Sequence, residues 1–193
     1  MQKTKIYIYG ASGHGQVVAD IARICGYEEI IFLDDKKGLK FDENLPKADI
    51  IIAIGDNKTR KNLQNKVVNC GFKIVSLIHP NAVISSFAKI GKGVVVMSNV
   101  VINAKATIGN GVILNTACVI EHECEIGDFV HISPNSSLAG NVKVGELTHI
   151  GIGSVVIQNL KIGKNVIVGA GSVVINDICD NIKIVGVPAK RIL

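Results

Sequence analysis

An aliphatic residue stands at every sixth position in the second half of the chain, without exception from Ile78 to Val168. Four places after each of them stands a mostly small side chain, and Leu160 is the one large residue of that second series. The helical period of 3.6 residues cannot produce a six-residue rule. The pattern instead predicts sixteen short repeats over residues 78–173, each a strand and a turn, with one branched and one small side chain pointing into a narrow core.

A second period, three times as long, is superimposed on the first. Glycine returns at every eighteenth position, at Gly91, Gly109, Gly127, Gly145 and Gly163. Three repeats would then complete one coil, and glycine is expected at the recurring corner because a tight turn often needs a positive φ. The sequence therefore predicts a triangular prism of parallel strands, a parallel β-helix of about five coils that rise by roughly 4.8 Å each.

The N-terminal part of the chain, up to residue 77, follows a different pattern. Apolar segments at 5–9, 29–33, 49–54 and 72–75 are expected to be strands, and segments 17–25 and 59–68 are expected to be helices. Strands that alternate with helices predict a small α/β domain with a Rossmann-like parallel sheet. We therefore expect an α/β domain over residues 1–77 and a β-helix domain over residues 78–193, whose tail leaves the six-residue rule from Asp177 onward.

Composition excludes several classes of protein. Aromatic residues make up only 4% of the chain and Trp is absent, so the core must be built from Ile, Val, Leu and Ala. The net charge of +5 is scattered, which does not indicate a nucleic-acid-binding face. No apolar stretch reaches the length of a membrane span or of a signal-peptide core, so we expect a cytoplasmic protein. The five cysteines form no C-x-x-C pair and indicate neither a disulfide framework nor a metal site.

A glycine-rich turn at residues 10–15 lies between the first expected strand and helix, where backbone N–H groups can receive a phosphate. Its G-x-x-G-x-G spacing departs from the dinucleotide pattern, and a tight turn without a ligand is an equal alternative. Asp34 and Asp35 end the second strand, where carboxylates can accept hydrogen bonds from a ribose or a base. Since few strands remain, the turn favours a single nucleotide, such as the diphosphate part of a sugar nucleotide.

His122 is the candidate for acid–base chemistry. It is the third residue of its repeat and should face outward, between Glu121 and Glu123. An imidazole beside a carboxylate is a candidate general base, and the alternative is a solvated polar pair. His79 and His149 are expected to be turn or surface residues without a function.

Eight segments resemble one known family. They are GASGHG at 10–15, IFLDD at 31–35, IAIG at 52–55, INAKA at 102–106, ILNT at 113–116, VIEHEC at 119–124, AGNVK at 139–143 and GVPAKR at 186–191. Together they resemble the bacterial UDP-N-acetylbacillosamine N-acetyltransferases, within the hexapeptide-repeat acyltransferase group that includes sialic acid O-acetyltransferases and perosamine N-acetyltransferases. The resemblance implies that the β-helix is left-handed, although parallel crossovers are usually right-handed.

The resemblance also implies roles for individual residues. His122 would be the general base, and Glu123 would increase its basicity. Acetyl-CoA would be bound by His131 at the acetyl end, by the Gly140 N–H at the thioester oxygen, and by Ile152 along the pantetheine. Ala170 would be a further acetyl-CoA contact, but it departs from the family pattern, in which a glycine is expected. The acceptor would be held by Asn115 near the amine and by Ser12, Gly13, His14, Asp34, Asp35 and Gly55 around the nucleotide.

A homotrimer with active sites between neighbouring prisms is implied as well. Apolar residues expected on the outer faces, such as Val95, Val101, Ile113 and Val119, agree with this, and the alternative is that they pack against the chain's own tail.

The expected activity is transfer of an acetyl group from acetyl-CoA to the 4-amino group of a UDP-linked 4-amino-4,6-dideoxy-N-acetyl sugar, as in bacillosamine synthesis for protein glycosylation. Cys118 and Cys124 occupy inward positions and should be buried, so direct transfer is preferred over an acyl-enzyme. The alternatives are an acetyltransferase for a GDP-linked amino sugar, one for O-acetylation of sialic acid, and a non-catalytic nucleotide-binding scaffold.

Overall fold

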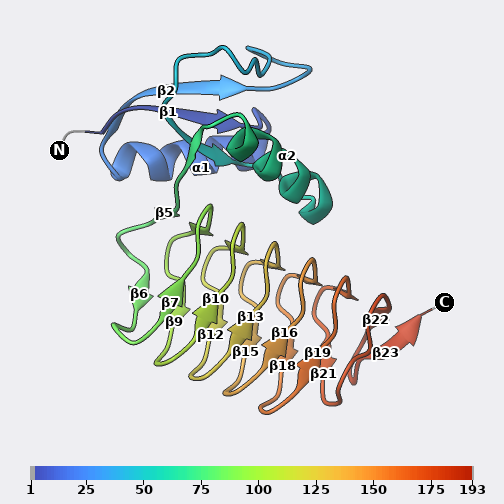
Figure 1. Ribbon diagram of the computed structural model, residues 1–193. Helices are drawn as coiled ribbons and strands as arrows, with labels where there is room; N and C mark the ends of the chain where they lie inside the picture. The colour runs from blue at the N-terminus through green and yellow to red at the C-terminus, as the bar shows by residue number, and fades with distance from the viewer. Residues whose placement is uncertain (1–2, 193) are drawn as a thin grey trace.

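The computed structural model describes residues 3–192 and shows an α/β layer seated on a long prism of coiled strands (Figure 1). The layer lies along the prism from the first coil to the start of the fifth, where the Asn57 side chain donates to the carbonyl oxygens of Leu147 and Thr148, and the described chain ends at the far end of the prism. Within residues 3–192, no helix combines the length and apolar character that crossing a membrane requires.

The α/β layer is a four-stranded parallel sheet in the order β2-β1-β3-β4. Its elements are β1 (Lys3–Tyr9), α1 (Gly13–Ile24), β2 (Tyr27–Leu33), β3 (Asp49–Ile52), α2 (Asn57–Asn69) and β4 (Lys73–Ile74). Because side chains alternate along β1, Ile6 and Ile8 pack with Val18 of α1, whereas Tyr7 packs with Val67 of α2. The expected strands and helices are all present, with bounds that shift by a few residues.

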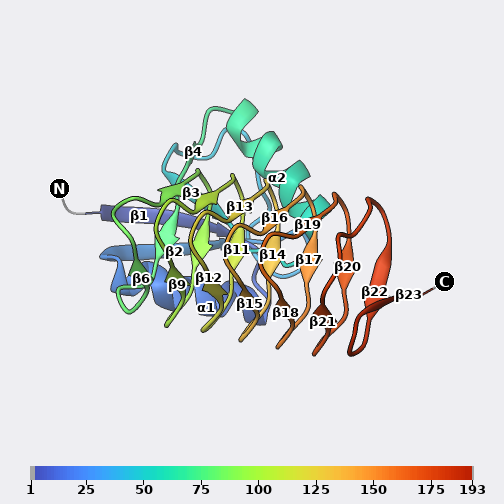
Figure 2. The ribbon, with the colours of Figure 1, turned by 90° about the horizontal axis from the view of Figure 1, so that it is seen from below.

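The prism has three faces, each a sheet of short parallel strands (Figure 2). Face 1 contains β5 (Leu77–Ile78), β8 (Val95–Val96), β11 (Ile113–Leu114), β14 (His131–Ile132), β17 (His149–Ile150), β20 (Ile167–Val168) and β22 (Lys183–Val185), with β23 (Lys190–Ile192) antiparallel at its end. Face 2 contains β6 (Val83–Ile84), β9 (Val101–Ile102), β12 (Val119–Ile120), β15 (Ser137–Leu138), β18 (Val155–Val156) and β21 (Val173–Val174). Face 3 contains β7 (Lys89–Ile90), β10 (Thr107–Ile108), β13 (Glu125–Ile126), β16 (Lys143–Val144) and β19 (Lys161–Ile162).

The structure is a left-handed parallel β-helix, as the resemblance implied. The aliphatic position of each repeat points inward, and from Val96 to Val174 these side chains are at most 4% exposed. Ile78 in the first coil is 37% exposed, because only one further coil packs on it.

The coil continues beyond the point where the sequence pattern ends, so that there are six coils and not five. After Val174 the chain shortens by two positions: Ile178 forms a bridge with Ile162, and Ile184 pairs with Val168. Both pairs are two positions closer in sequence than the pairs of earlier coils, such as Ile162 with Val144. The chain does leave the six-residue rule near Asp177, as predicted, but the prism continues for one more turn, because the chain is two residues shorter there.

The recurring glycines have a different role from the one expected. None of the five has a positive φ; the left-handed residue of that corner comes two places later, for example Gly111 at +61° and Leu147 at +62°. Glycine is needed because successive coils approach closely. A Cβ on Gly109 would lie 2.7 Å from the Asp128 nitrogen, and one on Gly145 would lie 2.6 Å from the Gly163 carbonyl carbon.

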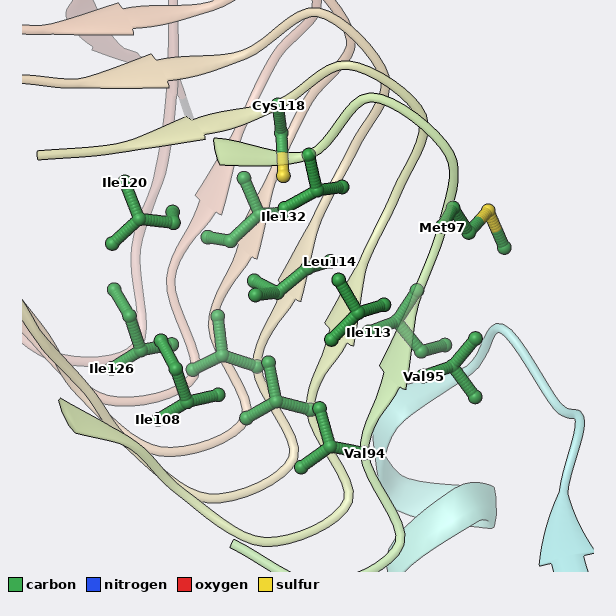
Figure 3. Packing of buried hydrophobic residues seen from close by; sticks show 14 of the residues in the cluster. Val94, Val95, Met97, Ile108, Ile113, Leu114, Cys118, Ile120, Ile126 and Ile132 are labelled. Atoms are coloured by element: carbon green, nitrogen blue, oxygen red, sulfur yellow. The ribbon is translucent and has the colours of Figure 1, made fainter. Parts of the chain in front are cut away.

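Face 1 is covered by the α/β layer, which corrects the expected outer surface. Ile113 and Val95 are at most 1% exposed, although they lie on the outer side of the wall, opposite the inward Leu114 (Figure 3). They belong to the same buried cluster as Val18 and Ala22 of α1, so it is the α/β layer that covers them and not the tail. Val101 and Val119 lie on face 2 and are partly exposed.

Arg60 of α2 joins the layer to the prism. Its fully buried guanidinium donates hydrogen bonds to the carbonyl oxygens of Ile54 and Gly55 in the layer, and to those of Gly111 and Phe129 at the edge of the prism, at 2.7–3.0 Å. Burial lowers the pKa of Arg60 to about 10, so it remains charged at neutral pH. These bonds fix the end of β3 over face 1.

We predict that Gly145→Ala destabilises the protein by about 1–3 kcal/mol, because the added methyl group meets the backbone of the next coil. This corresponds to a Tm lower by roughly 3–10 °C, measurable by calorimetry. Gly13→Ala is the matched control: it adds the same methyl group where no atom lies within 4 Å, and its Tm should not fall. Equal effects of the two substitutions would contradict the close-approach explanation.

Candidate active site

His122 stands on the outer surface of the prism, at the corner between faces 2 and 3. It follows β12, and its side chain is 59% exposed, so the outward orientation is confirmed. Its Nδ1 lies 3.3 Å from Oε2 of Glu123. The backbone of Glu123 is left-handed, with φ of +62°, and this turn places the carboxylate beside the ring.

The charge on Glu123 determines which imidazole nitrogen can act as a base. The hydrogen bond from His122 and the nearby Lys105 ammonium, whose Nζ lies 3.6 Å from Oε1, lower the pKa of this carboxyl. An ionised carboxylate accepts a hydrogen bond from Nδ1–H, so the proton of the neutral ring stays on Nδ1 and Nε2 keeps its lone pair.

The Nε2 side of the ring lies over Gly140, which is one coil further along the prism. A Cβ on Gly140 would lie 2.6 Å from Nε2 and 2.5 Å from Cε1 of His122, so only glycine allows this approach. The structure therefore brings together His122, Glu123 and Gly140, all expected at the active site.

A second group of polar residues lies on face 1 and at the corner between faces 1 and 2. The Asn115 side-chain oxygen accepts a hydrogen bond from the Thr116 N–H at 2.8 Å, so its amide nitrogen donates to His131 Nε2 at 3.2 Å. The His131 ring stacks on His149, with centroids 4.7 Å apart and an interplanar angle of 22°. His149 Nε2 in turn lies 2.8 Å from the hydroxyl of Ser133.

His149 was wrongly expected in a turn or on the surface. It lies on β17, and burial lowers its pKa, with Arg60 adding to the effect. The signal was present in the sequence, because His149 follows His131 by the length of one full coil and therefore stacks on it. His79, the other histidine set aside, does lie in the turn after β5, where its Nδ1 accepts a hydrogen bond from the Asn81 N–H.

The α/β layer closes over His131. Burial, followed by the charges of His149, Arg60 and His14, lowers the pKa of His131 to about 3. Burial and Arg60 lower the pKa of His14 to about 4. His14 Nε2 and His131 Nδ1 are buried and have no hydrogen-bond partner among the residues that the structure describes. Two neutral imidazoles thus leave unsatisfied nitrogen atoms near the junction of the layer and the prism.

The glycine-rich turn contains two kinds of glycine. Gly10 has φ of +125°, and a Cβ there would lie 2.6 Å from the Ala53 carbonyl oxygen; a Cβ on Gly15 would collide with the Gly10 carbonyl oxygen. These two glycines serve packing. Gly13 has no heavy atom within 4 Å of its Cβ position, and the Ser12 side chain makes no capping bond to α1. The first turn of α1 is therefore open on the Gly13 side.

The two aspartates at the end of β2 already have partners within the chain. The Asp34 carboxylate accepts hydrogen bonds from the N–H groups of Ala11, Lys36 and Lys37 at 2.8–3.0 Å, which lower its pKa. Asp35 accepts one from the Tyr9 hydroxyl at 3.1 Å. Asp34 thereby ties the glycine-rich turn to the loop after β2.

Apart from those on the α/β layer, the expected site residues fall into two sets on different corners of the prism. His122, Glu123 and Gly140 lie between faces 2 and 3. Asn115, Ile152 and Ala170 lie between faces 1 and 2, with His131 on face 1 beside them; Ile152 is 52% exposed. Within one chain, face 2 separates the two sets.

Two cysteines of the prism, Cys118 and Cys124, are buried, as expected, whereas Cys179 in the last coil is exposed. Cys118 is fully buried, and desolvation raises the pKa of its thiol to about 12. Burial also raises the pKa of Cys124. Over residues 3–192 no three His, Cys, Asp or Glu side chains gather in the way that a metal ion would require.

Comparison with sequence families and curated proteins finds relatives for the layer and for part of the chain. The family model of the PglD N-terminal domain matches residues 5–67. UDP-N-acetylbacillosamine N-acetyltransferase of Bacillus subtilis (strain 168) is 38% identical over 110 residues, covering 48% of this chain and 51% of that protein. The match spans about half the length of this curated relative.

Solved structures match the whole chain. The acetyltransferase domain of PglB from Neisseria gonorrhoeae FA1090, in complex with acetyl coenzyme A, is 38% identical, with a TM-score of 0.93 and full coverage of both chains. PerB from Caulobacter crescentus, in complex with CoA and GDP-perosamine, is 38% identical, with a TM-score of 0.93 over 97% of this chain and 96% of PerB.

We predict that the neutral His131 makes the protein less stable in acid. Its pKa of about 3 in the folded chain lies below the ordinary 6.5, so unfolding takes up a proton once the pH falls below 6.5. The free energy of unfolding should fall by about 2 kcal/mol from this residue between pH 7 and pH 5. Urea unfolding at both pH values, compared with His131→Asn, measures the difference; the same pH dependence in both proteins would contradict the assignment.

Proposed function

The chain belongs to the family of hexapeptide-repeat N-acetyltransferases that act on nucleotide-linked amino sugars, and from this premise we propose that it acetylates the 4-amino group of a UDP-linked 4-amino-4,6-dideoxy-N-acetyl sugar. Acetyl-CoA is the proposed acetyl donor. The observation that carries the proposal is the exposed His122 ring, with Nδ1 on the Glu123 carboxylate and Nε2 over Gly140.

The proposed reaction is a direct transfer. His122 Nε2 removes a proton from the attacking amine as its nitrogen bonds to the acetyl carbon, and Glu123 stabilises the imidazolium that forms. No acceptor within residues 3–192 binds the Gly140 N–H, which leaves it available for the oxyanion of the tetrahedral intermediate. The C–S bond then breaks, and CoA leaves as the thiol once it gains the proton from His122. The high thiol pKa of Cys118 supports a route without an acyl-enzyme.

We place the nucleotide on the α/β domain of residues 1–77. Ser12, Gly13 and His14 follow β1, Asp34 and Asp35 follow β2, and Gly55 follows β3. The carboxyl ends of parallel strands meet at one edge of a sheet, where such folds bind ligands. The open side of Gly13 and the unpartnered His14 Nε2 support this placement.

We propose that a second copy of the chain completes each site, within a homotrimer. His122, Glu123 and Gly140 of one copy would then face Asn115, His131, Ile152 and Ala170 of the next. Face 2 lies between the two sets and carries an apolar row that includes Val83, 66% exposed, and Val155, 40% exposed. Burial of this row against a neighbouring prism would remove apolar surface from water.

A GDP-linked amino sugar is the second candidate acceptor, because PerB, whose structure contains GDP-perosamine, matches this chain as well as the PglB domain does. Thermal stabilisation of the protein by UDP and by GDP separates the two candidates. The intact contact between His122 and Glu123 does not favour a non-catalytic scaffold. A cytoplasmic location stays a prediction.

We predict that His122→Ala lowers kcat by about 10²- to 10⁴-fold, because the variant lacks the base that takes the proton from the amine. The measurement is acetyl-CoA consumption over a panel of UDP- and GDP-linked 4-amino sugars. His79→Ala, in the turn after β5, is the control and should retain wild-type turnover. Near-normal turnover of His122→Ala with every acceptor that the wild type uses would remove the proposed base.

We predict that two inactive variants restore each other's activity when they assemble together. His122→Ala and Asn115→Ala damage different corners of the prism, so a mixed assembly contains some sites with both intact residues. A homotrimer that contains both variants has one such site out of three, so the purified mixed assembly should recover about a third of the wild-type activity. Co-expression with two affinity tags, followed by the same assay, tests this; no recovery in a purified mixed assembly would place both residues in a site within one chain.

A further inference from the structure

Lys105 lies one coil before Glu123, on the same corner of the prism. The two residues have the same left-handed backbone, each with φ of +62°. The Glu123 N–H donates to the Ala104 carbonyl oxygen at 3.0 Å, which fixes the two turns on each other. Lys105 Nζ lies 3.6 Å from Glu123 Oε1, while Glu123 Oε2 lies 3.3 Å from His122 Nδ1. The carboxylate thus lies between an ammonium group and an imidazole.

We propose that Lys105 is a positioning residue: it holds one oxygen of the Glu123 carboxylate so that the other oxygen keeps the proton of His122 on Nδ1. The tautomer of a neutral imidazole is set by the hydrogen bond that one of its nitrogens makes. A carboxylate that rotates away from Nδ1 no longer favours the form in which Nε2 has a free lone pair. This inference deepens the proposed function and relies on it only for the catalytic consequence.

The stacking of the coils supports the contact between Lys105 and Glu123, because a second pair of side chains in the same column is joined in the same way. Asn141 and Asn159 continue the same left-handed column one and two coils beyond Glu123. Their side chains are joined in the same way, with the amide nitrogen of Asn141 3.0 Å from the side-chain oxygen of Asn159. Side chains in this column are therefore directed along the prism axis toward the next coil.

Other charges near His122 do not replace Lys105. Glu121 accepts a hydrogen bond from the His122 backbone N–H at 3.3 Å and carries the opposite charge to lysine. Gly140 and Asn141, on the next coil, are uncharged. Lys143 pairs with Glu125 at 2.6 Å on face 3. Within residues 3–192, Lys105 is the cation that forms an ion pair with Glu123.

The expected change in the tautomer population of His122 follows from the exposure of the three side chains. The Lys105, Glu123 and His122 side chains are 73%, 50% and 59% exposed, so solvent weakens the pair. The loss of an ion pair that is this exposed changes a population by about 1.4- to fivefold. Loss of Lys105 should therefore shift the tautomer population of His122 without abolishing the Nδ1–H form.

The experiment compares the wild type with Lys105→Gln and Lys105→Arg. Nitrogen-15 NMR of labelled histidine gives the fraction of neutral His122 with the proton on Nδ1. We expect the ratio of Nδ1–H to Nε2–H forms to fall by about 1.4- to fivefold in Lys105→Gln and to return toward the wild-type ratio in Lys105→Arg. Lys89→Gln, which removes a charge from face 3, is the matched control and should leave the ratio unchanged.

Kinetics supply a second readout. In Lys105→Gln we expect kcat to fall in proportion to the fraction of His122 with the proton on Nδ1, by at most about fivefold, while the KM for acetyl-CoA stays within about twofold, because the base and not the binding site is affected. An unchanged tautomer ratio in a folded Lys105→Gln protein, or no recovery with arginine, would overturn the inference. The absence of acetyl transfer by the wild type would count against the proposed function. It would not count against the role of Lys105, which the tautomer ratio measured by NMR tests independently.

Discussion

The stacking of one coil directly on the next, at a fixed offset along the sequence, is the constraint on which the rest of the structure depends. Parallel pairing places Glu125 beside Thr107 and His149 beside His131, each pair one full coil apart. The same offset sets the His122 ring over Gly140 and Lys105 beside Glu123. The contact between His122 and Glu123 lies within one turn, whereas the contacts of this pair with Gly140 and Lys105 join neighbouring coils. The geometry of these contacts is as rigid as the backbone ladder that carries them, which is what a base and an oxyanion donor require of their support.

A second constraint, the buried Arg60, joins the α/β layer to the prism. It binds carbonyl oxygens of both parts and no carboxylate within residues 3–192, so its positive charge is not neutralised by an ion pair. That charge helps to keep His14 and His131 unprotonated. The bonds from Arg60 to Ile54 and Gly55 also hold the end of β3 against the prism. The position of the layer over the prism is thereby tied to the position of His131.

Sequence periodicity predicted the features of the fold that the local geometry of each repeat determines. It failed to predict the features that depend on contacts between residues far apart in the sequence. The six-residue rule correctly assigned the inward side chains, the burial of Cys118 and the outward His122. It did not distinguish an outward face covered by the layer from an exposed one, so Ile113 was placed on the surface. The corner glycines were identified for the wrong reason, because a close approach between coils requires glycine just as a turn with a positive φ does. Arg60 gave no signal, since an arginine on an amphipathic helix usually faces water.

His122 is exposed in a single chain, and the proposed assembly would cover it. At 59% exposure the imidazole and its carboxylate are surrounded by water, which weakens their interaction and leaves a thioester open to hydrolysis. A neighbouring prism packed on the apolar row of face 2 would cover this corner and bring its own Asn115 and His131 toward it. The same contact would therefore exclude water, strengthen the ion pairs of Glu123 and supply the groups that hold the acceptor amine. In this arrangement a lone chain carries a correctly oriented base without the enclosure that makes the base effective.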